Sequence, residues 1–364
     1  MLSIAIVGLP NVGKSTLFNA LTDSNILAAN YPFATIEPNT GIVPVPDERL
    51  QKLSELYGDA PVKPATVNFV DVAGLVKGAS EGEGLGNQFL SHIRAANAIV
   101  QVVRAFDDPN VVTDEATGKH DPAKDIEIIN TELVLADLQT VQKRLPKLDK
   151  EARANPKLRP QVDALQAIHD LLDNGKPIFS DETLRVQNSE LLADLFLLTA
   201  KPIIYLFNVD ENGLQDSAKQ RQLQELVAPA QALFVCAKLE DELRSLDDTD
   251  RTEMLDSYGV AESGLVQLIH AAYATLGLQS YLTAGEQEVR AWTIPQGATA
   301  PQAAGVIHGD FERGFIAADI VSYPDLMAAG SLQAARAAGK LRTEGKTYIM
   351  QPNDVVEFKF NVSK

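Results

Sequence analysis

The residues best suited to chemistry lie near the start of the chain. There, Gly8-Leu9-Pro10-Asn11-Val12-Gly13-Lys14-Ser15 reads G-x-x-x-x-G-K-S, the spacing of a phosphate-binding P-loop, or Walker A motif. Glycines let backbone N–H groups turn toward a phosphate, and the N-terminus of a following helix adds positive charge. We expect Lys14 to contact the β- and γ-phosphates and the Ser15 hydroxyl to bind Mg²⁺. The predicted nucleotide-binding residues of this loop are Asn11, Val12, Gly13, Lys14, Ser15 and Thr16.

A second motif follows 57 residues after Lys14, where Asp71-Val72-Ala73-Gly74 reads D-x-x-G. It comes directly after the β-branched and aromatic run 66–70, so it should lie at the carboxyl end of a strand, where ligands bind in open α/β sheets. We expect Asp71 to hold a magnesium-bound water and the Gly74 amide to sense the γ-phosphate.

Between these motifs lies a loop with Asn30-Tyr31-Pro32-Phe33-Ala34-Thr35. In switch proteins a loop threonine binds magnesium when the γ-phosphate is present, and Thr35 is predicted for this role, with Thr40 as the alternative. A purely structural loop fixed by its prolines is the other interpretation. The glycine-rich run 78–86 is predicted as a second switch region.

The base of the nucleotide should be read at Asn208-Val209-Asp210-Glu211, which stands where GTPases carry N-K-x-D. The lysine is replaced by Val209, and Glu211 is one methylene longer than the aspartate that binds guanine. Losing a fitted hydrogen-bonding pair costs several orders of magnitude in discrimination. Asn208 could instead bond N6 and N7 of adenine, and Ala237, whose amide favours guanine O6, completes the predicted base site. ATP is favoured, and a GTPase of the same architecture is the alternative.

These motifs require elements that position them. The apolar run 2–7 predicts a buried strand and 16–21 the start of a helix, so strand, loop and helix occur in the order a P-loop needs. Further strands are predicted at 41–44, 66–70, 98–103, 202–207 and 233–235, and helices at 87–96 and 264–276. Together they predict an α/β fold with a mostly parallel sheet flanked by helices.

Two insertions or additions to this fold are predicted. Between residues 122 and 200, two apolar stripes at helical spacing run through 126–148, a polar tip follows at 151–160, and a second helix is predicted at 162–172. This order indicates an antiparallel helical hairpin that projects from the sheet domain, and a plain packed helical subdomain is the alternative. After Gly277, strands at 288–294, 315–322 and 355–360 and a short helix at 300–308 indicate a small α+β domain. We therefore expect a nucleotide-binding domain at 1–278, with the arm at 122–200, and a second domain at 279–364.

Composition limits the classes of function. The chain has 364 residues, 45% of them apolar and 22% charged, and no apolar run approaches membrane-spanning length. The single cysteine, Cys236, excludes an intrachain disulfide, and the chain enters its first strand without a signal peptide, so a cytoplasmic protein is expected. The net charge of −17 argues against non-specific DNA binding. Residues 279–364 are nearly neutral at −1, so we expect any RNA contact to come from a local patch near the C-terminus.

The ordered motifs resemble the YchF (Obg-like ATPase) family of P-loop proteins, and 290–294, 309–316 and 351–358 resemble its C-terminal TGS domain. The resemblance covers the whole chain. It implies slow ATP hydrolysis with Mg²⁺, a coiled-coil arm and ribosome association on the large-subunit side, with nothing requiring more than a monomer. It also implies stimulation by K⁺ through Asn11. Leu75 matches the hydrophobic residue that replaces the catalytic glutamine in such proteins.

The sequence departs from the family at one catalytic position. Many members carry a histidine in the loop after the strand at 98–103, whereas this chain has Thr113 there and its nearest histidine is His120. The predicted catalytic residues are Lys14, Gly74 and His120. Two other functions stay open: an interaction module whose nucleotide is structural, and a phosphotransferase acting on a small molecule.

Overall fold

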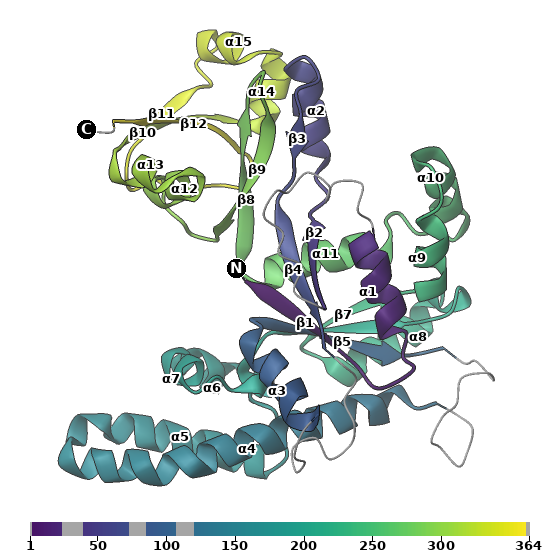
Figure 1. Cartoon of the computed structure of the whole chain (residues 1–364), viewed down its shortest axis with the longest axis vertical. Coiled ribbons are helices and arrows are strands. Elements are labelled where there is room, and N and C mark those ends of the chain that lie inside the picture. The colour runs from purple at the N-terminus through teal and green to yellow at the C-terminus, as the bar shows by residue number, and fades with distance from the viewer. Residues whose placement is uncertain (1, 24–38, 73–84, 107–119, 362–364) are drawn as a thin grey trace. The chain divides into compact units, whose positions relative to one another are not determined.

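The structure is a computed structural model and describes residues 2–23, 39–72, 85–106 and 120–361. The chain divides into two compact units (Figure 1). Unit 1 comprises Met1–Ile42 and Asn68–Leu268, and unit 2 comprises Val43–Val67 and Ile269–Lys364. Within the described residues, no helix is both long and apolar enough to cross a membrane.

Unit 1 is built on a six-stranded sheet, sheet 1. Its strands are β1 (Ser3–Val7), β2 (Thr40–Pro44), β4 (Thr66–Asp71), β5 (Ala98–Arg104), β6 (Ile203–Asn208) and β7 (Gln231–Val235). They lie in the order β2-β4-β1-β5-β6-β7, and the pairs β1–β4, β1–β5, β5–β6 and β6–β7 are parallel. All residues of β5 and β6 are buried, which explains why these strands are nearly continuous apolar runs. The predicted parallel sheet is confirmed.

The helices in this part of the chain are α1 (Lys14–Asp23), α3 (Leu85–Ala95), α4 (Pro122–Ala154), α8 (Ser217–Val227), α9 (Ala237–Leu243), α10 (Asp248–Ser257) and α11 (Gly264–Thr275). The boundary between the two units falls within α11. One apolar cluster joins residues of β1, β5 and β6 to residues of α3, α4 and α8. The sheet therefore has a helical layer on the face where these three helices pack.

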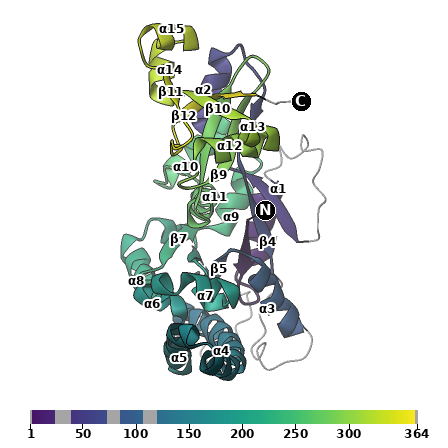
Figure 2. The ribbon, with the colours of Figure 1, turned by 90° about the vertical axis from the view of Figure 1, so that its left-hand side faces the viewer.

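The arm consists of α4, 33 residues long, and the antiparallel α5 (Arg159–Asp173), followed by the short helices α6 (Glu182–Gln187) and α7 (Ser189–Asp194). Figures 1 and 2 both show α4 and α5 side by side. The two apolar stripes of α4 pack in two different apolar clusters. Ile126, Ile129 and Leu133 pack against sheet 1, whereas Val141 and Leu148 pack against α5. The predicted helical hairpin is confirmed.

At the root of the arm, the Asp137 carboxylate is fully buried and accepts three hydrogen bonds. The donors are the Leu198 N–H at 2.8 Å, the Thr199 N–H at 2.7 Å and the Thr199 hydroxyl at 2.8 Å. Because a buried carboxylate is costly unless its oxygens are bonded, this contact fixes α4 to the segment that follows α7.

Unit 2 is built on sheet 2, with the order β11-β10-β12-β8-β9-β3. The strands are β3 (Val62–Lys63), β8 (Leu278–Ala284), β9 (Val289–Pro295), β10 (Phe315–Ser322), β11 (Arg342–Glu344) and β12 (Asp354–Phe360). The helices are α2 (Glu48–Leu56), α12 (Ala300–Ile307), α13 (Gly309–Arg313), α14 (Tyr323–Ala329) and α15 (Leu332–Ala337). A buried cluster that includes Tyr281, Ala304 and Ile320 forms its core. The predicted small α+β architecture is confirmed.

The compact units differ from the predicted division at residues 278 and 279. Residues 43–67, expected within the nucleotide-binding domain, cluster with unit 2. The physical reason is strand pairing: β3 pairs in parallel with β9, the Val289 N–H donates to the Pro61 carbonyl at 2.9 Å, and Lys63 lies 2.5 Å from Glu288. Residues 43–67 thus supply β3 as an edge strand to sheet 2.

Candidate nucleotide-binding site

The P-loop connects β1 to α1 and requires glycine at particular positions. Asn11 and Gly13 have φ values of +63° and +91°, in the left-handed region. A Cβ on Gly13 would lie 2.4 Å from Asn208 Nδ2, and one on Gly8 would lie 2.9 Å from Val12 Cγ2. The glycines of the motif are therefore required by the tight turn and by the side chains packed against it.

Lys14 and Asp71 come together at the carboxyl ends of β1 and β4. The Lys14 ammonium forms an ion pair and hydrogen bond with Asp71 Oδ1, and the Lys14 residue is only 9% exposed. Ser15 and Thr16, at the start of α1, are exposed. The predicted phosphate-binding lysine thus lies beside the predicted metal-binding carboxylate.

The residues predicted for Mg²⁺ can be compared with that ion's preferences. Magnesium binds proteins through one or two oxygen ligands, together with waters and substrate phosphates. The Ser15 hydroxyl and the Asp71 carboxylate are donors of this kind, and parallel strands bring them to one edge of the sheet. These donors fit Mg²⁺. The other predicted residues of the phosphate side, Thr35 and Gly74, lie outside the described residues, as do Leu75 and Thr113.

Asn208 connects the P-loop to the base side of the site. It is 3% exposed, its Nδ2 donates to the Val12 carbonyl at 3.0 Å, and its Oδ1 accepts from the Ala237 N–H at 3.0 Å. The sequence predicted that this amide reads adenine N6 and N7. In the structure each end of the amide makes one bond within the protein, so Asn208 holds the two segments of the site together. A second N–H and a second oxygen lone pair stay available, and the role in reading adenine stays a prediction.

Glu211 lies at the rim of the site and is paired. Its Oε1 is 2.8 Å from Lys238 Nζ, and this hydrogen bond raises the pKa of Lys238. Asp210 points elsewhere, because its carboxylate accepts from the Gly213 N–H at 2.8 Å, and Val209 is buried. The sequence analysis missed Lys238, although it follows Ala237 immediately after β7.

A cavity of about 610 Å³ lies between these residues. Its lining includes Gly13 and Thr16 from the P-loop, Asn208 and Glu211 after β6, and Ala237 and Lys238 after β7. This volume is within the usual range for a small-molecule site. Phe106, which follows β5, also lines the cavity and was not predicted. The four predicted base residues and two of the six predicted loop residues, Gly13 and Thr16, therefore line one space of nucleotide size.

His120 lies at the other end of a stretch that the structure does not describe, just before α4. Its Nε2 is 3.1 Å from Asp125 Oδ2 in the first turn of that helix. The described residues provide no contact between His120 and Lys14. The catalytic role predicted for His120 therefore stays a prediction.

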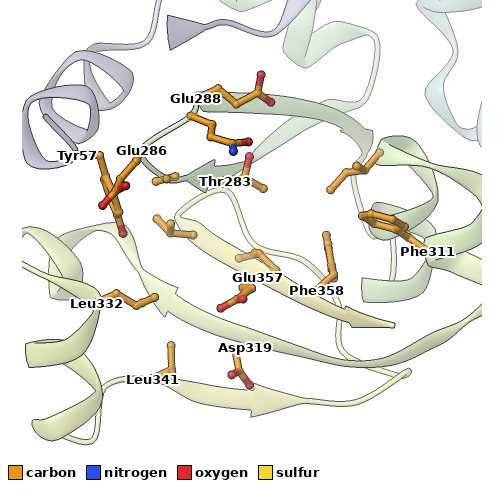
Figure 3. A pocket seen from close by; sticks show the side chains of 16 residues that line it. Tyr57, Thr283, Glu286, Glu288, Phe311, Asp319, Leu332, Leu341, Glu357 and Phe358 are labelled. Carbon is orange, nitrogen blue, oxygen red and sulfur yellow. The ribbon is translucent and has the colours of Figure 1, made fainter. Parts of the chain in front are cut away.

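A second cavity, of about 460 Å³, lies in unit 2 (Figure 3). Figure 3 shows the carboxylates Glu286, Glu288, Asp319 and Glu357 around it, with apolar residues such as Leu332 on its other walls. Asp319 is neutralised by Lys359 at 2.6 Å. A cavity rimmed by carboxylates is unsuited to a polyphosphate, so the nucleotide site is the one in unit 1.

The strand–glycine loop–helix geometry, with Lys14 beside Asp71 and a base-side cavity, defines a P-loop nucleotide-binding protein. Residues 3–153 match the family described as "50S ribosome-binding GTPase", and residues 278–361 match YchF-GTPase_C, described as "Protein of unknown function (DUF933)".

Full-length relatives narrow the class further. The chain is 50% identical to "Ribosome-binding ATPase YchF" of Bacillus subtilis, over 99% of this chain and 100% of that protein. It is 42% identical to "Obg-like ATPase 1" of Pongo abelii, over 99% and 92% of the two chains. The solved structure of the Schizosaccharomyces pombe YchF GTPase matches with a TM-score of 0.87 and 40% identity, over 98% and 97%. The chain belongs to the YchF (Obg-like ATPase) family.

Proposed function

We propose that this chain is an ATPase that binds the ribosome, with slow turnover that couples nucleotide state to ribosome binding. The observation that carries the choice of ATP is the Glu211–Lys238 pair at the rim of the base-side cavity. A guanine-specific site needs an aspartate carboxylate for the N1–H and the exocyclic amine, whereas Glu211 is one methylene longer and its Oε1 is held by Lys238. The names of the Bacillus subtilis and Pongo abelii relatives also specify an ATPase, and the first specifies the ribosome.

The residues have the following proposed roles. Lys14 and the P-loop amides hold the β- and γ-phosphates, and the Gly74 amide senses the γ-phosphate. Ser15 and Thr35 bind Mg²⁺ directly and Asp71 binds it through water. When bound, the ion neutralises charge on the phosphates. Val209 and Ala237 line the base site, Asn11 supports stimulation by K⁺, and His120 is the proposed replacement for the loop histidine. The TGS character of the C-terminal domain and a cytoplasmic location belong to the same proposal.

GTP is the second candidate nucleotide, because two of the proteins and families that this chain matches are described as GTPases. The family matching residues 3–153 and the Schizosaccharomyces pombe structure are both described as GTPases. The fold does not discriminate between the two purines, since it is shared by both classes. Discrimination must therefore come from the few residues around the base.

The proposal is tested by measuring phosphate release from ATP and from GTP with the full chain, with Mg²⁺ present and with K⁺ or Na⁺ as the monovalent ion. We expect slow release from ATP that K⁺ stimulates, and little release from GTP. Co-sedimentation with purified ribosomes provides the second readout. Faster release from GTP would establish the GTPase alternative, and ribosome binding without any turnover would leave an interaction module.

A further inference from the structure

The cavity in unit 2 combines apolar walls with negative charge. Its volume of about 460 Å³ is within the usual range for a small-molecule site. The apolar lining includes Leu332, Leu341 and Phe358, and the acidic lining consists of the four carboxylates labelled in Figure 3. None of the described residues that line the cavity is Lys, Arg or His. A ligand that complements this cavity therefore carries positive charge together with apolar surface.

Two of these carboxylates are neutralised by lysines of the same unit. Lys63 Nζ lies 2.5 Å from Glu288 Oε2, and Lys359 Nζ lies 2.6 Å from Asp319 Oδ2. Because each of these charges has a partner within the protein, neither requires a ligand.

Glu286 and Glu357 are exposed and differ from the first two carboxylates. In the parts of the chain that the structure describes, no Lys, Arg or His forms an ion pair with either of them. Glu357 also lies directly opposite Asp319 in the antiparallel β10–β12 pair, and like charges at opposite positions destabilise a sheet. Burial and, to a smaller extent, the Glu357 charge raise the pKa of Tyr57, which also lines the cavity. A bound cation would relieve the repulsion at Glu357.

The positions of Glu286 and Glu357 favour an extended cation over a single metal ion. Glu286 lies in the turn between β8 and β9, and Glu357 lies on β12, on separate walls of the cavity (Figure 3). Within the described residues, no group of three or more His, Cys, Asp or Glu is arranged to hold a metal ion. Two unpaired carboxylates on separate walls of an apolar cavity instead complement a chain that carries ammonium groups at both ends.

We propose that this cavity binds a linear aliphatic polyamine, in which ammonium groups are separated by short methylene chains. The ammonium groups pair with Glu286 and Glu357, and the methylene groups lie against Leu332 and Leu341, where burial of apolar surface is favourable. The inference goes beyond the proposed function and does not depend on it, because the nucleotide site lies in unit 1.

The single tryptophan of the chain is a reporter for this cavity. Trp292 Nε1 donates to the Thr283 hydroxyl at 2.9 Å, and Thr283 lines the cavity. The Arg290 guanidinium lies 3.8 Å from the centre of the indole ring, and its Nη1 is 4.0 Å from Glu288 Oε1. A cation in the cavity therefore acts on two neighbours of Trp292, and we expect the emission of Trp292 to change on binding.

The test measures spermidine binding to the full chain at low salt by calorimetry and follows Trp292 emission in parallel. The variant Glu286→Gln/Glu357→Gln removes the two unpaired charges and keeps the shapes of the side chains. An exposed ion pair contributes a factor of up to about five, so we expect saturable binding by the native chain and an affinity about 5- to 30-fold lower in the variant. Absence of saturable binding to the native chain would overturn the proposal. An emission change with the same midpoint in both chains would also overturn it.

A matched control separates the cavity from the net charge of −17, which attracts any cation. Glu225→Gln/Glu253→Gln removes two charges at exposed glutamates of α8 and α10, in unit 1. This variant should bind spermidine as the native chain does, and equal losses in the two double variants would contradict the proposal. Thermal unfolding midpoints verify that each variant is folded.

Two competing ligands test the chemical class. Mg²⁺ at matched ionic strength should displace spermidine no more than Na⁺ does, because a metal ion cannot use the apolar walls. Displacement by Mg²⁺ well beyond that of Na⁺ would show general attraction of cations and overturn the proposal. Tighter binding of tri-lysine than of spermidine would assign the cavity to a basic peptide, which would also overturn it.

Discussion

At the scale of single residues, the site depends on the side-chain amide of Asn208. The sequence predicts that this amide reads the base, and the structure adds a second role: it joins Val12, 196 residues away in the chain, to Ala237. A motif gives the identity of such a residue. It does not reveal which backbone groups the fold will bring within 3 Å of the side chain.

We predict that Asn208→Ala destabilises the chain and weakens ATP binding together. The substitution leaves the Val12 carbonyl and the Ala237 N–H without their side-chain partner in a buried region. Unsatisfied buried groups cost about 1–3 kcal/mol each, so we expect a loss of about 2–4 kcal/mol in the free energy of unfolding. Urea unfolding measures it, with the exposed Asn212→Ala as the control, for which we expect a change below about 0.5 kcal/mol. A neutral Asn208→Ala variant would refute the bridging role.

Asn11 allows a second prediction for a single residue. Two substitutions distinguish the effect of its left-handed backbone conformation from the effect of its side-chain amide. Its φ of +63° suits glycine, so Asn11→Gly keeps the loop conformation and removes only the amide. We expect this variant to bind ATP as the native chain does and to lose the stimulation of phosphate release by K⁺. Asn11→Ala adds a left-handed strain of about 1–2 kcal/mol and should weaken both properties. Undiminished stimulation in Asn11→Gly would exclude Asn11 as the K⁺ ligand.

At the scale of elements, a buried carboxylate fixes the start of α11. Glu240 of α9 is 5% exposed and accepts from the Ser263 hydroxyl at 2.6 Å and the Gly264 N–H at 2.8 Å. Burial raises the pKa of Glu240 above its ordinary value of 4.5, although these hydrogen bonds oppose the shift. The folded state therefore holds a proton on this group more readily than the unfolded state does.

The pH dependence follows from that difference. The contribution of Glu240 to stability is fully present below pH 4.5 and is lost as the pH rises through the higher pKa of the folded state. We predict that the stability of the native chain falls relative to Glu240→Gln as the pH is raised from 4 through that range. Denaturant titrations at a series of pH values measure the difference. The exposed Glu242→Gln should produce no such trend, and a trend of opposite sign for Glu240→Gln would contradict the assignment.

Elements were predictable from sequence to different degrees, for physical reasons. Buried parallel strands such as β5 and β6 require apolar residues on both faces, so their runs are clear in the sequence. The two apolar stripes of α4 are also visible in the sequence, and the structure shows that they belong to two different apolar clusters. In contrast, α2 and β3 were missed, because β3 has only two residues and gains its structure from pairing with β9, far away in the sequence.

The base-side cavity was only partly predictable. The order of Asn208, Glu211 and Ala237 indicated a base site, but the pairing of Glu211 with Lys238 depends on how the ends of β6 and β7 are arranged.

At the scale of the whole molecule, each compact unit is made of two segments that are far apart in the sequence. Arg49 illustrates this in unit 2, where its Nη1 donates to the Pro352 carbonyl at 2.6 Å and to Asn353 Oδ1 at 3.0 Å. The hydrogen bond with Asp47 raises the pKa of Arg49, so its charge is retained. Through Arg49, the segment 43–67 is thereby hydrogen-bonded to the loop before β12.

We predict that Arg49→Ala destabilises unit 2 without affecting sheet 1. Loss of these partly exposed bonds should cost about 1 kcal/mol, which corresponds to roughly fivefold faster amide exchange in β9 and β12. Hydrogen exchange of the full chain measures this, with β1 and β5 as internal references and Lys52→Ala on the same helix as the control. If Arg49→Ala increased amide exchange more in β5 than in β9, the result would contradict the division into units.

The central claim is that this family member uses ATP because of the residues around its base-side cavity. The most direct measurement is a pair of calorimetric titrations, with ATP and with GTP, on the native chain and on Val209→Lys/Glu211→Asp, which restores the N-K-x-D pattern. We predict at least a tenfold preference of the native chain for ATP and the loss of that preference in the double variant. Equal or tighter binding of GTP by the native chain would contradict the account.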